Sequence, residues 1–252
     1  MIDFHTHILP QIDDGSSCVE ESTALLESLE EQGVTDVLLT PHYYGRWKGV
    51  EDFLRSREES FSLLSAAYKG RIALRRACEC NIATCANTRL SDLKPLAVEG
   101  TDYILIEMSF TPAWEDKLLF RVEELIAETG LTPVIAHVEL YPAVQRRPAL
   151  ASELMRMGCL LQINCDSVAK GRKNDLVFAL LRHSMAHCLG SDTHNTVARP
   201  PLYRQAIRRI EETFGEGYVG AMQANMRRIL SGEKVASVFG APVKKGLFGN
   251  YR

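Results

Sequence analysis

The sequence lacks a hydrophobic run long enough to cross a membrane, and it lacks an excess of positive charge. Its apolar segments all fall short of the roughly 18 to 20 residues that a transmembrane helix needs. The formal net charge is −3, whereas nucleic-acid-binding domains usually carry a basic face. We therefore expect no membrane insertion and no nucleic-acid partner.

A secretion signal and a disulfide pattern are also missing. The first residues contain no basic segment followed by an apolar one, as a signal peptide would. The cysteines number 7, which is odd, and they are scattered along the chain. This is typical of reduced thiols rather than of a secreted disulfide framework. Together these absences predict a cytoplasmic location.

No linker rich in proline, glycine or serine divides the 252 residues, and no repeat of about 20 to 50 residues is present. We therefore expect a single domain over residues 1–252. Short apolar segments alternate with amphipathic ones, a pattern typical of parallel strands joined by helices in an α/β fold. The expected strands cover 1–5, 36–42, 72–79, 102–108, 132–137, 159–164 and 186–192, and the expected helices 16–33, 50–70, 116–130, 149–158, 174–184 and 201–215. A serine is expected to cap the first helix, and residues 241–252 to form a loosely held tail.

Polar residues end the expected strands, which favours a β/α barrel over an open sheet. In a barrel the carboxyl ends of all strands converge on one mouth, whereas an open sheet gathers only groups near its switch point. His5 and His7 are two residues apart on an expected strand, so both side chains point to one face. The other strand-end residues are His42, Glu79, Glu107, His137, Asp192 and His194.

These strand-end side chains offer nitrogen and oxygen atoms, and no thiolate, to a metal. Imidazole and carboxylate ligands suit Mn, Fe, Zn or Co, and glutamates often bridge two ions. The set is larger than a single ion needs, so we expect two or three ions. Such ions generate a bridging hydroxide near neutral pH and stabilise an in-line phosphoryl displacement. The cluster therefore predicts a hydrolase.

Several short motifs resemble one known family. They are DFHTH…DDG, TPHY, the glutamate that ends the third expected strand, IEMSF, VIAHVE, LLQIN and GSDTHN…RPP. In this order they resemble the polymerase and histidinol phosphatase (PHP) superfamily. Within it they most resemble the manganese-dependent tyrosine-protein phosphatases encoded with bacterial capsule and exopolysaccharide genes. The resemblance implies a distorted (β/α)7 barrel with the metal site at the C-terminal ends of the strands.

The resemblance also implies how the ligands divide among the ions, of which Mn is expected and Fe, Zn, Co or Mg are alternatives. The first ion is expected at His5, His7, Glu79 and Asp192. Glu79 would bridge to the second, which Glu107 and His137 complete. The third is expected at Asp14, His42 and His194. Catalytic roles are expected for Arg199, His42 and Asp192.

Asp14 has a competitor as a ligand, and the strand-five motif departs from the family. Asp13 could reach the ion instead, with Asp14 capping the next helix. The family motif H-P-E-R-Y reads HVELY here, so Leu140 replaces the arginine expected to hold phosphate. Leucine cannot form the bidentate pair that a guanidinium forms with phosphate. We expect phosphate binding to rest mainly on the metals and Arg199, while Arg146 and Arg147, close downstream, could substitute for the missing arginine.

Other residues near the mouth have less specific expectations. Loop aromatics could stack on a substrate ring, although packing against neighbouring loops explains each of them equally well. These aromatics are Tyr43, Tyr44, Phe110 and Trp114. Cys78 and Cys80 flank Glu79, and strand alternation points both away from the mouth into the core.

The expected activity is hydrolysis of phosphotyrosine by metal-bridging hydroxide, acting on the tyrosine-rich tail of a bacterial tyrosine kinase that controls capsular or exopolysaccharide synthesis. A cysteine-dependent mechanism is excluded, because no cysteine is followed by an arginine six positions later. Two alternatives remain open. One is a phosphoesterase for a small metabolite such as histidinol phosphate or a sugar phosphate. The other is a catalytically weakened metal-binding regulator. The oligomeric state is left open.

Overall fold

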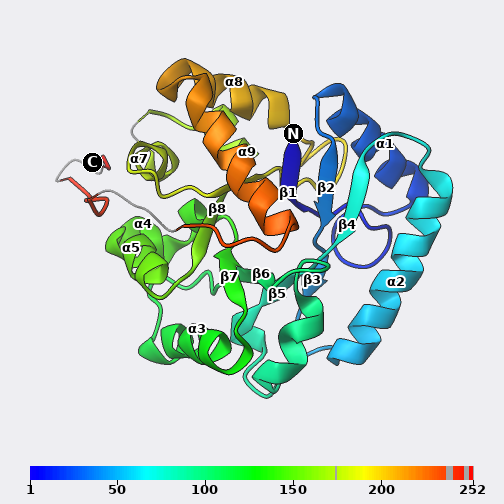
Figure 1. Cartoon of the computed structure of the whole chain (residues 1–252), viewed down its shortest axis with the longest axis horizontal. Coiled ribbons are helices and arrows are strands. Elements are labelled where there is room, and N and C mark those ends of the chain that lie inside the picture. Colours follow the sequence, from blue (N-terminus) through cyan, green and yellow to red (C-terminus); the bar gives the residue numbers. More distant parts are fainter. Residues whose placement is uncertain (174, 237–240, 247–249, 252) are drawn as a thin grey trace.

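The computed structural model describes residues 1–173, 175–236, 241–246 and 250–251. Its strands form two parallel sheets that curl around a common centre (Figure 1). The smaller sheet has the order β1-β2-β4 and the larger sheet the order β3-β5-β6-β7-β8-β9. The strands are β1 (Ile2–Thr6), β2 (Asp36–Leu39), β3 (His42–Tyr43), β4 (Ala73–Arg76), β5 (Glu79–Asn81), β6 (Tyr103–Glu107), β7 (Thr132–Ile135), β8 (Leu160–Asn164) and β9 (Cys188–Gly190).

Two of the expected strands are divided in the structure. Residues 36–42 form β2 and β3, and residues 72–79 form β4 and the start of β5. Pro41 lies in the first break, where it has no amide hydrogen to donate to a neighbouring strand. Its carbonyl still accepts a hydrogen bond from the Glu79 amide at 3.0 Å. The breaks place β3 and β5 in the larger sheet, while β2 and β4 stay beside β1.

Backbone hydrogen bonds also join the first strand to the segment after the last. The Asp192 amide donates to the His5 carbonyl at 2.7 Å, and the His7 amide donates to the Thr193 carbonyl at 2.9 Å. If each divided strand is counted once, the described strands occupy seven positions around the centre. The expected α/β fold, a distorted (β/α)7 barrel, is therefore confirmed.

Helices surround the curled sheets (Figure 1). Helix α3 ends at a glycine, as its sequence predicts: Gly130 has a φ of 73°, the left-handed conformation that favours glycine. None of the described helices combines the length and apolar character needed to cross a membrane. The α-helices are α1 (Val19–Glu31), α2 (Val50–Ala67), α3 (Asp116–Thr129), α4 (Pro142–Arg146), α5 (Ala149–Arg156), α6 (Cys165–Lys170), α7 (Leu176–Arg182), α8 (Tyr203–Phe214) and α9 (Glu216–Leu230), and the 3₁₀ turns are η1 (Ile82–Thr84), η2 (Leu90–Leu96) and η3 (Val138–Leu140).

The expected serine cap of the first helix is wrong. Cys18 is the N-cap of α1, and no side chain accepts a hydrogen bond from that helix end. The neighbouring Ser17 is engaged elsewhere, because its hydroxyl and its amide both donate to the Glu21 carboxylate, at 2.9 and 2.8 Å. A local side-chain bond has therefore replaced the cap.

The sequence does not predict α9. Gly217 and Gly220 lie in its first half, and glycine costs about 1 kcal/mol relative to alanine inside a helix. Tertiary packing overrides this cost, because Val219, Met222 and Met226 are buried at helical spacing.

Part of the expected loose tail is attached to the barrel. The Lys245 ammonium and the Tyr251 hydroxyl both donate to the Gln145 carbonyl, at 3.0 and 2.9 Å. Residues 247–249 and 252 of that segment lie outside the described residues, as does Asn174 at the expected start of the helix over 174–184.

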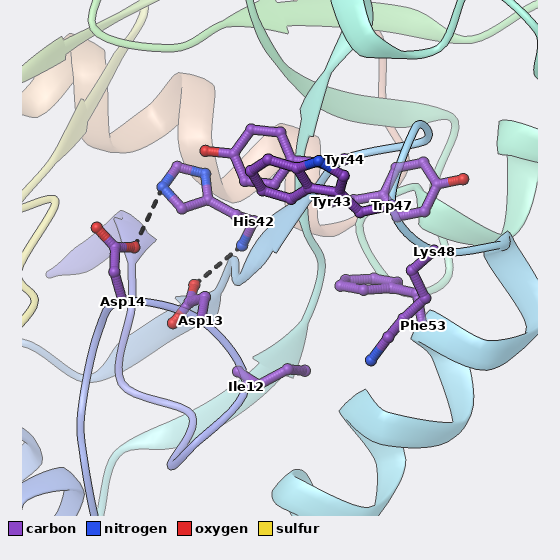
Figure 2. Close-up of a pocket in the computed structure, with 9 residues that line it drawn as sticks. All are labelled: Ile12, Asp13, Asp14, His42, Tyr43, Tyr44, Trp47, Lys48 and Phe53. Carbon is purple, nitrogen blue, oxygen red and sulfur yellow. Dashed lines mark hydrogen bonds and ion pairs between the residues drawn. The ribbon is translucent and has the colours of Figure 1, made fainter.

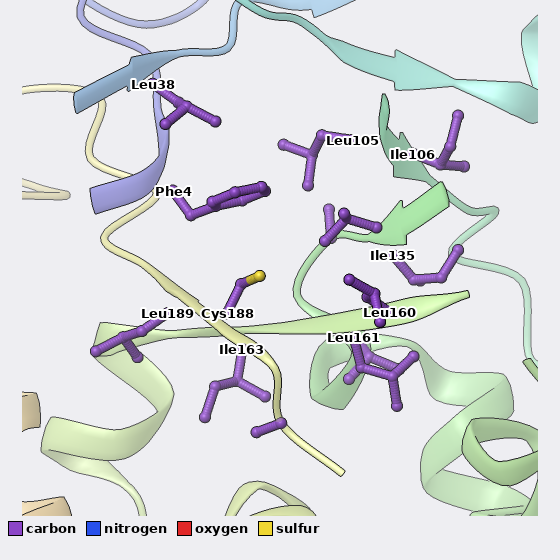
Figure 3. Close-up of a cluster of buried hydrophobic side chains, with 14 of the residues drawn as sticks. Phe4, Leu38, Leu105, Ile106, Ile135, Leu160, Leu161, Ile163, Cys188 and Leu189 are labelled. Atoms are coloured by element: carbon purple, nitrogen blue, oxygen red, sulfur yellow. The ribbon is translucent and has the colours of Figure 1, made fainter. Parts of the chain in front are cut away.

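The barrel interior has an apolar part and a polar part. Figure 3 shows Phe4, Leu105 and Cys188 pointing toward one another, and all three are fully buried. Leu105 lies two residues before Glu107 on β6, so both side chains share one face of that strand. The apolar part therefore gives way to polar side chains toward the carboxyl ends of the strands. Cys78 and Cys80 are also fully buried, which confirms the expectation that they are core residues.

Candidate metal centre

The predicted ligands lie at one end of the barrel, supplied by strand ends and the loops that follow them. His5 belongs to β1. His42 begins β3 and Glu79 begins β5, and both follow a strand break that the sequence does not reveal. The ligand atoms form four overlapping groups whose members lie within 4.8 Å of one another. These groups are His5, His7 and Asp192; His5, Glu79 and His137; His42, Glu79 and Glu107; and His7, Asp14, His42 and His194.

The most compact arrangement surrounds the predicted first ion. The Nε2 atoms of His5 and His7 face one another at 3.0 Å. Glu79 Oε2 lies 3.2 Å from the first nitrogen and 3.3 Å from the second. Asp192 Oδ1 lies 3.7 and 3.5 Å from the same two atoms. All four side chains are buried, so their lone pairs converge on a small volume closed to solvent, and this donor set fits a divalent cation.

Glu79 stands at the centre of the cluster. Its Oε1 lies 2.7 Å from His137 Nε2, and its Oε2 lies 2.9 Å from His42 Nδ1. The contact with His42 lacks hydrogen-bond geometry, and both of its atoms are buried without a hydrogen-bond partner. Unpartnered buried polar atoms are costly, and a shared cation would remove that cost.

The predicted second ion differs from the observed grouping in one respect. Glu107 groups with His42 and Glu79 rather than with His137. Asn81, on the neighbouring β5, donates to Glu107 Oε2 at 2.5 Å. Glu79 therefore connects two groups, one that includes His137 and one that includes Glu107.

The structure places Asp14, rather than Asp13, with the predicted third set of ligands. Asp14 Oδ1 lies 3.5 Å from the Nε2 atoms of both His42 and His194. Asp13 Oδ2 instead lies 2.7 Å from Nδ1 of His7 and accepts from the His42 amide at 2.9 Å. Asp14 also caps no helix, since the N-cap of α1 is Cys18. Asp13 thus orients a histidine, a role that carboxylates often have beside metal ligands.

Two further polar side chains hold the cluster in place, and the sequence does not single them out for this role. Gln162 Oε1 lies 3.2 Å from Nδ1 of His5, and Asn164 donates to Asp192 Oδ2 at 2.7 Å. Their two-residue spacing on β8 matches that of His5 on β1 and His7 just after it, which is the signal that could have found them.

Two of the predicted ligands have an unusual backbone. His137 has a φ of 32° and Asp192 a φ of 53°. Non-glycine residues rarely adopt positive φ, and where they do, the strain is often found at functional sites. The surrounding contacts hold both residues in this conformation and aim their side chains at Glu79 and His5.

Electrostatics within the cluster favour the charged forms of Asp192 and His137. Burial opposes ionisation of Asp192, but the charges of His5 and His7 lower its pKa to about 2. Burial likewise opposes protonation of His137, but the Glu79 carboxylate raises the pKa of this histidine to about 9. Protons therefore compete with a cation for the imidazole nitrogens, so that cation binding weakens as the pH falls.

Arg199 lies against the cluster, whereas Arg147, one of the two expected substitutes for the missing arginine, does not. Its Nη2 lies 2.7 Å from Asp192 Oδ2, and its Nη1 donates to His194 Nε2 at 2.8 Å. Arg147 instead pairs with Glu153 at 2.8 Å. Leu140 is partly exposed and lines, with Arg199, a cavity of about 160 Å³.

The family model described as "Capsular polysaccharide synthesis, CpsB/CapC" matches residues 1–231. The chain belongs to this CpsB/CapC family. The resemblance found in the sequence motifs is thereby confirmed.

Relatives of this CpsB/CapC protein carry phosphatase names. Tyrosine-protein phosphatase CpsB of Streptococcus agalactiae serotype V is 30% identical over 236 residues, which cover 86% of this chain and 92% of the relative. Tyrosine-protein phosphatase YwqE of Bacillus subtilis is 27% identical over 256 residues, which cover 99% of both chains. A solved structure, described as one of the "unique metal-dependent tyrosine phosphatases" YwqE from Bacillus subtilis and CpsB from Streptococcus pneumoniae, superimposes with a TM-score of 0.83 at 25% identity. The superposition covers 97% of this chain and 100% of the other.

Proposed function

We propose that this CpsB/CapC protein is a metal-dependent phosphatase that hydrolyses phosphotyrosine in proteins. The observation that carries the proposal is a buried set of four ligand atoms. Glu79 Oε2 and Asp192 Oδ1 each lie within 3.7 Å of the Nε2 atoms of both His5 and His7. The names of the relatives supply the substrate, phosphotyrosine, and the solved structure supplies the dependence on metal.

We propose two or three divalent ions, with Mn the expected metal and Fe, Zn, Co or Mg the alternatives. The first ion would use His5, His7, Glu79 and Asp192, and the second would use Glu79, Glu107 and His137. The third would use Asp14, His42 and His194. When bound, such ions lower the pKa of a coordinated water and act as Lewis acids on phosphoryl oxygens.

The protein's own residues would orient the ligands and bind the phosphoryl group. Three side chains contact the ligands on the atoms that do not face the cluster. Asp13 contacts His7, Gln162 contacts His5, and Asn164 donates to Asp192. Arg199 is about half exposed and touches Asp192 and His194, so its guanidinium is available to a phosphoryl oxygen at the cluster. A phenol leaves more readily than an aliphatic alcohol because its pKa is only about 10, which reduces the need for a strong general acid.

We further propose that one domain, residues 1–252, carries this activity in the cytoplasm. Its substrate would be the phosphorylated, tyrosine-rich tail of a bacterial tyrosine kinase that controls capsular or exopolysaccharide synthesis. The family description, which concerns capsular polysaccharide synthesis, supports this choice.

A second candidate is a phosphoesterase for a small metabolite, and Leu140 favours it. An apolar side chain beside Arg199 leaves one cation fewer for a phosphoryl group than the family motif provides. A catalytically weakened regulator that only binds metal is a third.

The test measures phosphate release from a phosphotyrosine peptide and from histidinol phosphate, after chelation and after Mn is added back. We expect Mn to restore peptide hydrolysis in the wild-type protein and not in His5→Ala. Arg199→Ala should retain the metal and lose about a hundredfold in kcat/KM. Hydrolysis of histidinol phosphate alone would select the metabolite enzyme. Bound metal with neither substrate cleaved would select the regulator.

A further inference from the structure

A cavity of about 390 Å³ opens beside the metal cluster and shares His42 and Asp14 with it (Figure 2). Its other lining residues are mainly aromatic or apolar and come from the loop after β1, from β3 and the segment after it, and from the start of α2. They are Ile12, Asp13, Tyr43, Tyr44, Trp47, Lys48 and Phe53. A group attached to a phosphate at His42 and Asp14 would lie in or next to this cavity.

Tyr44 and Trp47 form the aromatic wall of the cavity. The Tyr44 ring lies 5.2 Å from the His42 ring and 4.6 Å from the Trp47 ring, measured between centroids. Figure 2 shows the two rings side by side next to His42. Tyr43 is instead buried and packs against Phe53, with the ring centroids 5.1 Å apart. Of the two adjacent tyrosines, Tyr44 is therefore the one placed to touch a ligand.

Trp47 is 68% exposed, which is unusual for the largest apolar side chain. Trp114, the other tryptophan, is buried and donates to the Ser109 carbonyl at 2.7 Å. Exposed tryptophans are enriched among residues that dominate binding energy. The cavity is also large enough, because an engineered cavity of about 150 Å³ already holds benzene.

Two cations flank Trp47 in the loop that connects β3 to α2. The Arg46 guanidinium lies 4.6 Å from the centre of the Trp47 ring, and the Lys48 ammonium donates to the Ser56 hydroxyl at 3.0 Å. Within the described part of the chain, neither forms an ion pair with a carboxylate. Both charges are thus available to an acidic group of a bound molecule.

We propose that this cavity binds the phenyl ring of phosphotyrosine against Tyr44 and Trp47, and that Arg46 and Lys48 bind an acidic residue next to that phosphotyrosine. This inference rests on the proposed function and specifies its substrate class, an acidic phosphotyrosyl segment. The ring contacts would select aryl phosphates over alkyl phosphates, because only an aryl group fills the aromatic wall.

The first test compares phenylphosphonate with ethylphosphonate, which share an anionic head and are not hydrolysed. Dissociation constants are measured by calorimetry on the Mn-loaded protein, and Trp47 fluorescence gives an independent signal. We expect phenylphosphonate to bind about tenfold more tightly and to change the fluorescence. Trp47→Ala should abolish both the preference and the fluorescence change.

Phe120→Ala is the matched control, because Phe120 is an aromatic residue 58% exposed on α3. It should keep the preference for the phenyl compound. Equal affinity for the two phosphonates in the wild-type protein, or a preference that survives in Trp47→Ala, would overturn the inference. If phosphotyrosine is hydrolysed but the preference for the phenyl compound is absent, the proposed function stands and the proposed binding of the ring in this cavity is wrong. If the preference is present without phosphotyrosine hydrolysis, the proposed function fails and an aryl-binding cavity remains.

The second test concerns the charges. The double variant Arg46→Gln, Lys48→Gln should bind an acidic phosphotyrosyl peptide several-fold more weakly, with a smaller dependence on salt. Its affinity for phenylphosphonate should stay unchanged, since that ligand has no acidic neighbour. Equal losses for both ligands would contradict the proposed role of the two cations.

Discussion

On β6, Leu105 and Glu107 share one strand face and are 0% and 7% exposed; on β8, Leu160 and Gln162 share a face and are 1% and 0% exposed. The apolar and polar parts of the barrel interior are therefore closed to solvent to a similar degree. The two parts differ in the interaction that makes burial of their side chains favourable. Packing suffices for the leucines, whereas each polar side chain needs a hydrogen-bond partner or a cation.

Histidines show the same contrast electrostatically. In the polar part, burial opposes the protonation of His137, but Glu79 raises its pKa to about 9. His187 lies in apolar surroundings beside β8, where burial lowers its pKa to about 4. A buried histidine is thus charged where a carboxylate lies beside it, as at His137, and neutral in apolar surroundings, as at His187.

The largest effect is expected from Glu79→Gln, which keeps the size of the side chain and removes its charge. Glu79 lies within 3.3 Å of nitrogen atoms of four histidines, His5, His7, His42 and His137. We expect the variant to lose metal and about a thousandfold in kcat. Metal content and phosphate release measure this. Retained metal and activity would remove Glu79 from the centre of the site.

In the apolar part of the barrel interior, the variant that corresponds to Glu79→Gln is Leu160→Ala. Large-to-small changes at fully buried sites cost about 2 to 5 kcal/mol in the free energy of unfolding, and Leu160 is 1% exposed. Urea denaturation should show this loss, while kcat of the folded fraction stays close to the wild-type value. A strong loss of kcat without loss of stability would mean that the two parts are not separable.

His187 should make stability depend on pH. Its pKa is lower in the folded protein than in the unfolded chain, so the unfolded chain binds the proton preferentially as the pH falls. Between pH 7 and pH 5 this linkage removes about 2 kcal/mol of stability. Denaturation of His187→Gln at both pH values should show a difference smaller by that amount. His183→Gln, which changes a histidine near the protein surface, is the control and should behave like the wild-type protein.

A smaller effect is expected from Asn164→Ala, which removes the hydrogen bond to Asp192 without removing a ligand. Groups that orient metal ligands typically contribute about 10-fold to 100-fold in metal affinity, and we expect the lower end of this range. Titration with Mn measures it. Gln162→Ala should act similarly through His5, whereas an unchanged affinity in both variants would show that the ligands need no support from β8.

The sequence by itself determined the alternation of strands and helices, the polar residues near the strand ends and the family. Such features depend on local periodicity and on motifs whose residues are close in the chain. The sequence could not decide between Asp13 and Asp14, because adjacent residues in a loop differ only in where the fold directs them. It also did not reveal the breaks that precede His42 and Glu79, or helix α9, whose glycines are compensated only by packing.

Only the tertiary structure decided which groups share the cluster. Glu79 meets histidines from three other segments of the chain because the two sheets curl and the segments after β1 and β9 are joined by hydrogen bonds. Periodicity indicates the face of a strand on which a side chain lies. The distance between side chains on different strands depends on the register and curvature of the sheet, which hydrogen bonds between distant residues establish.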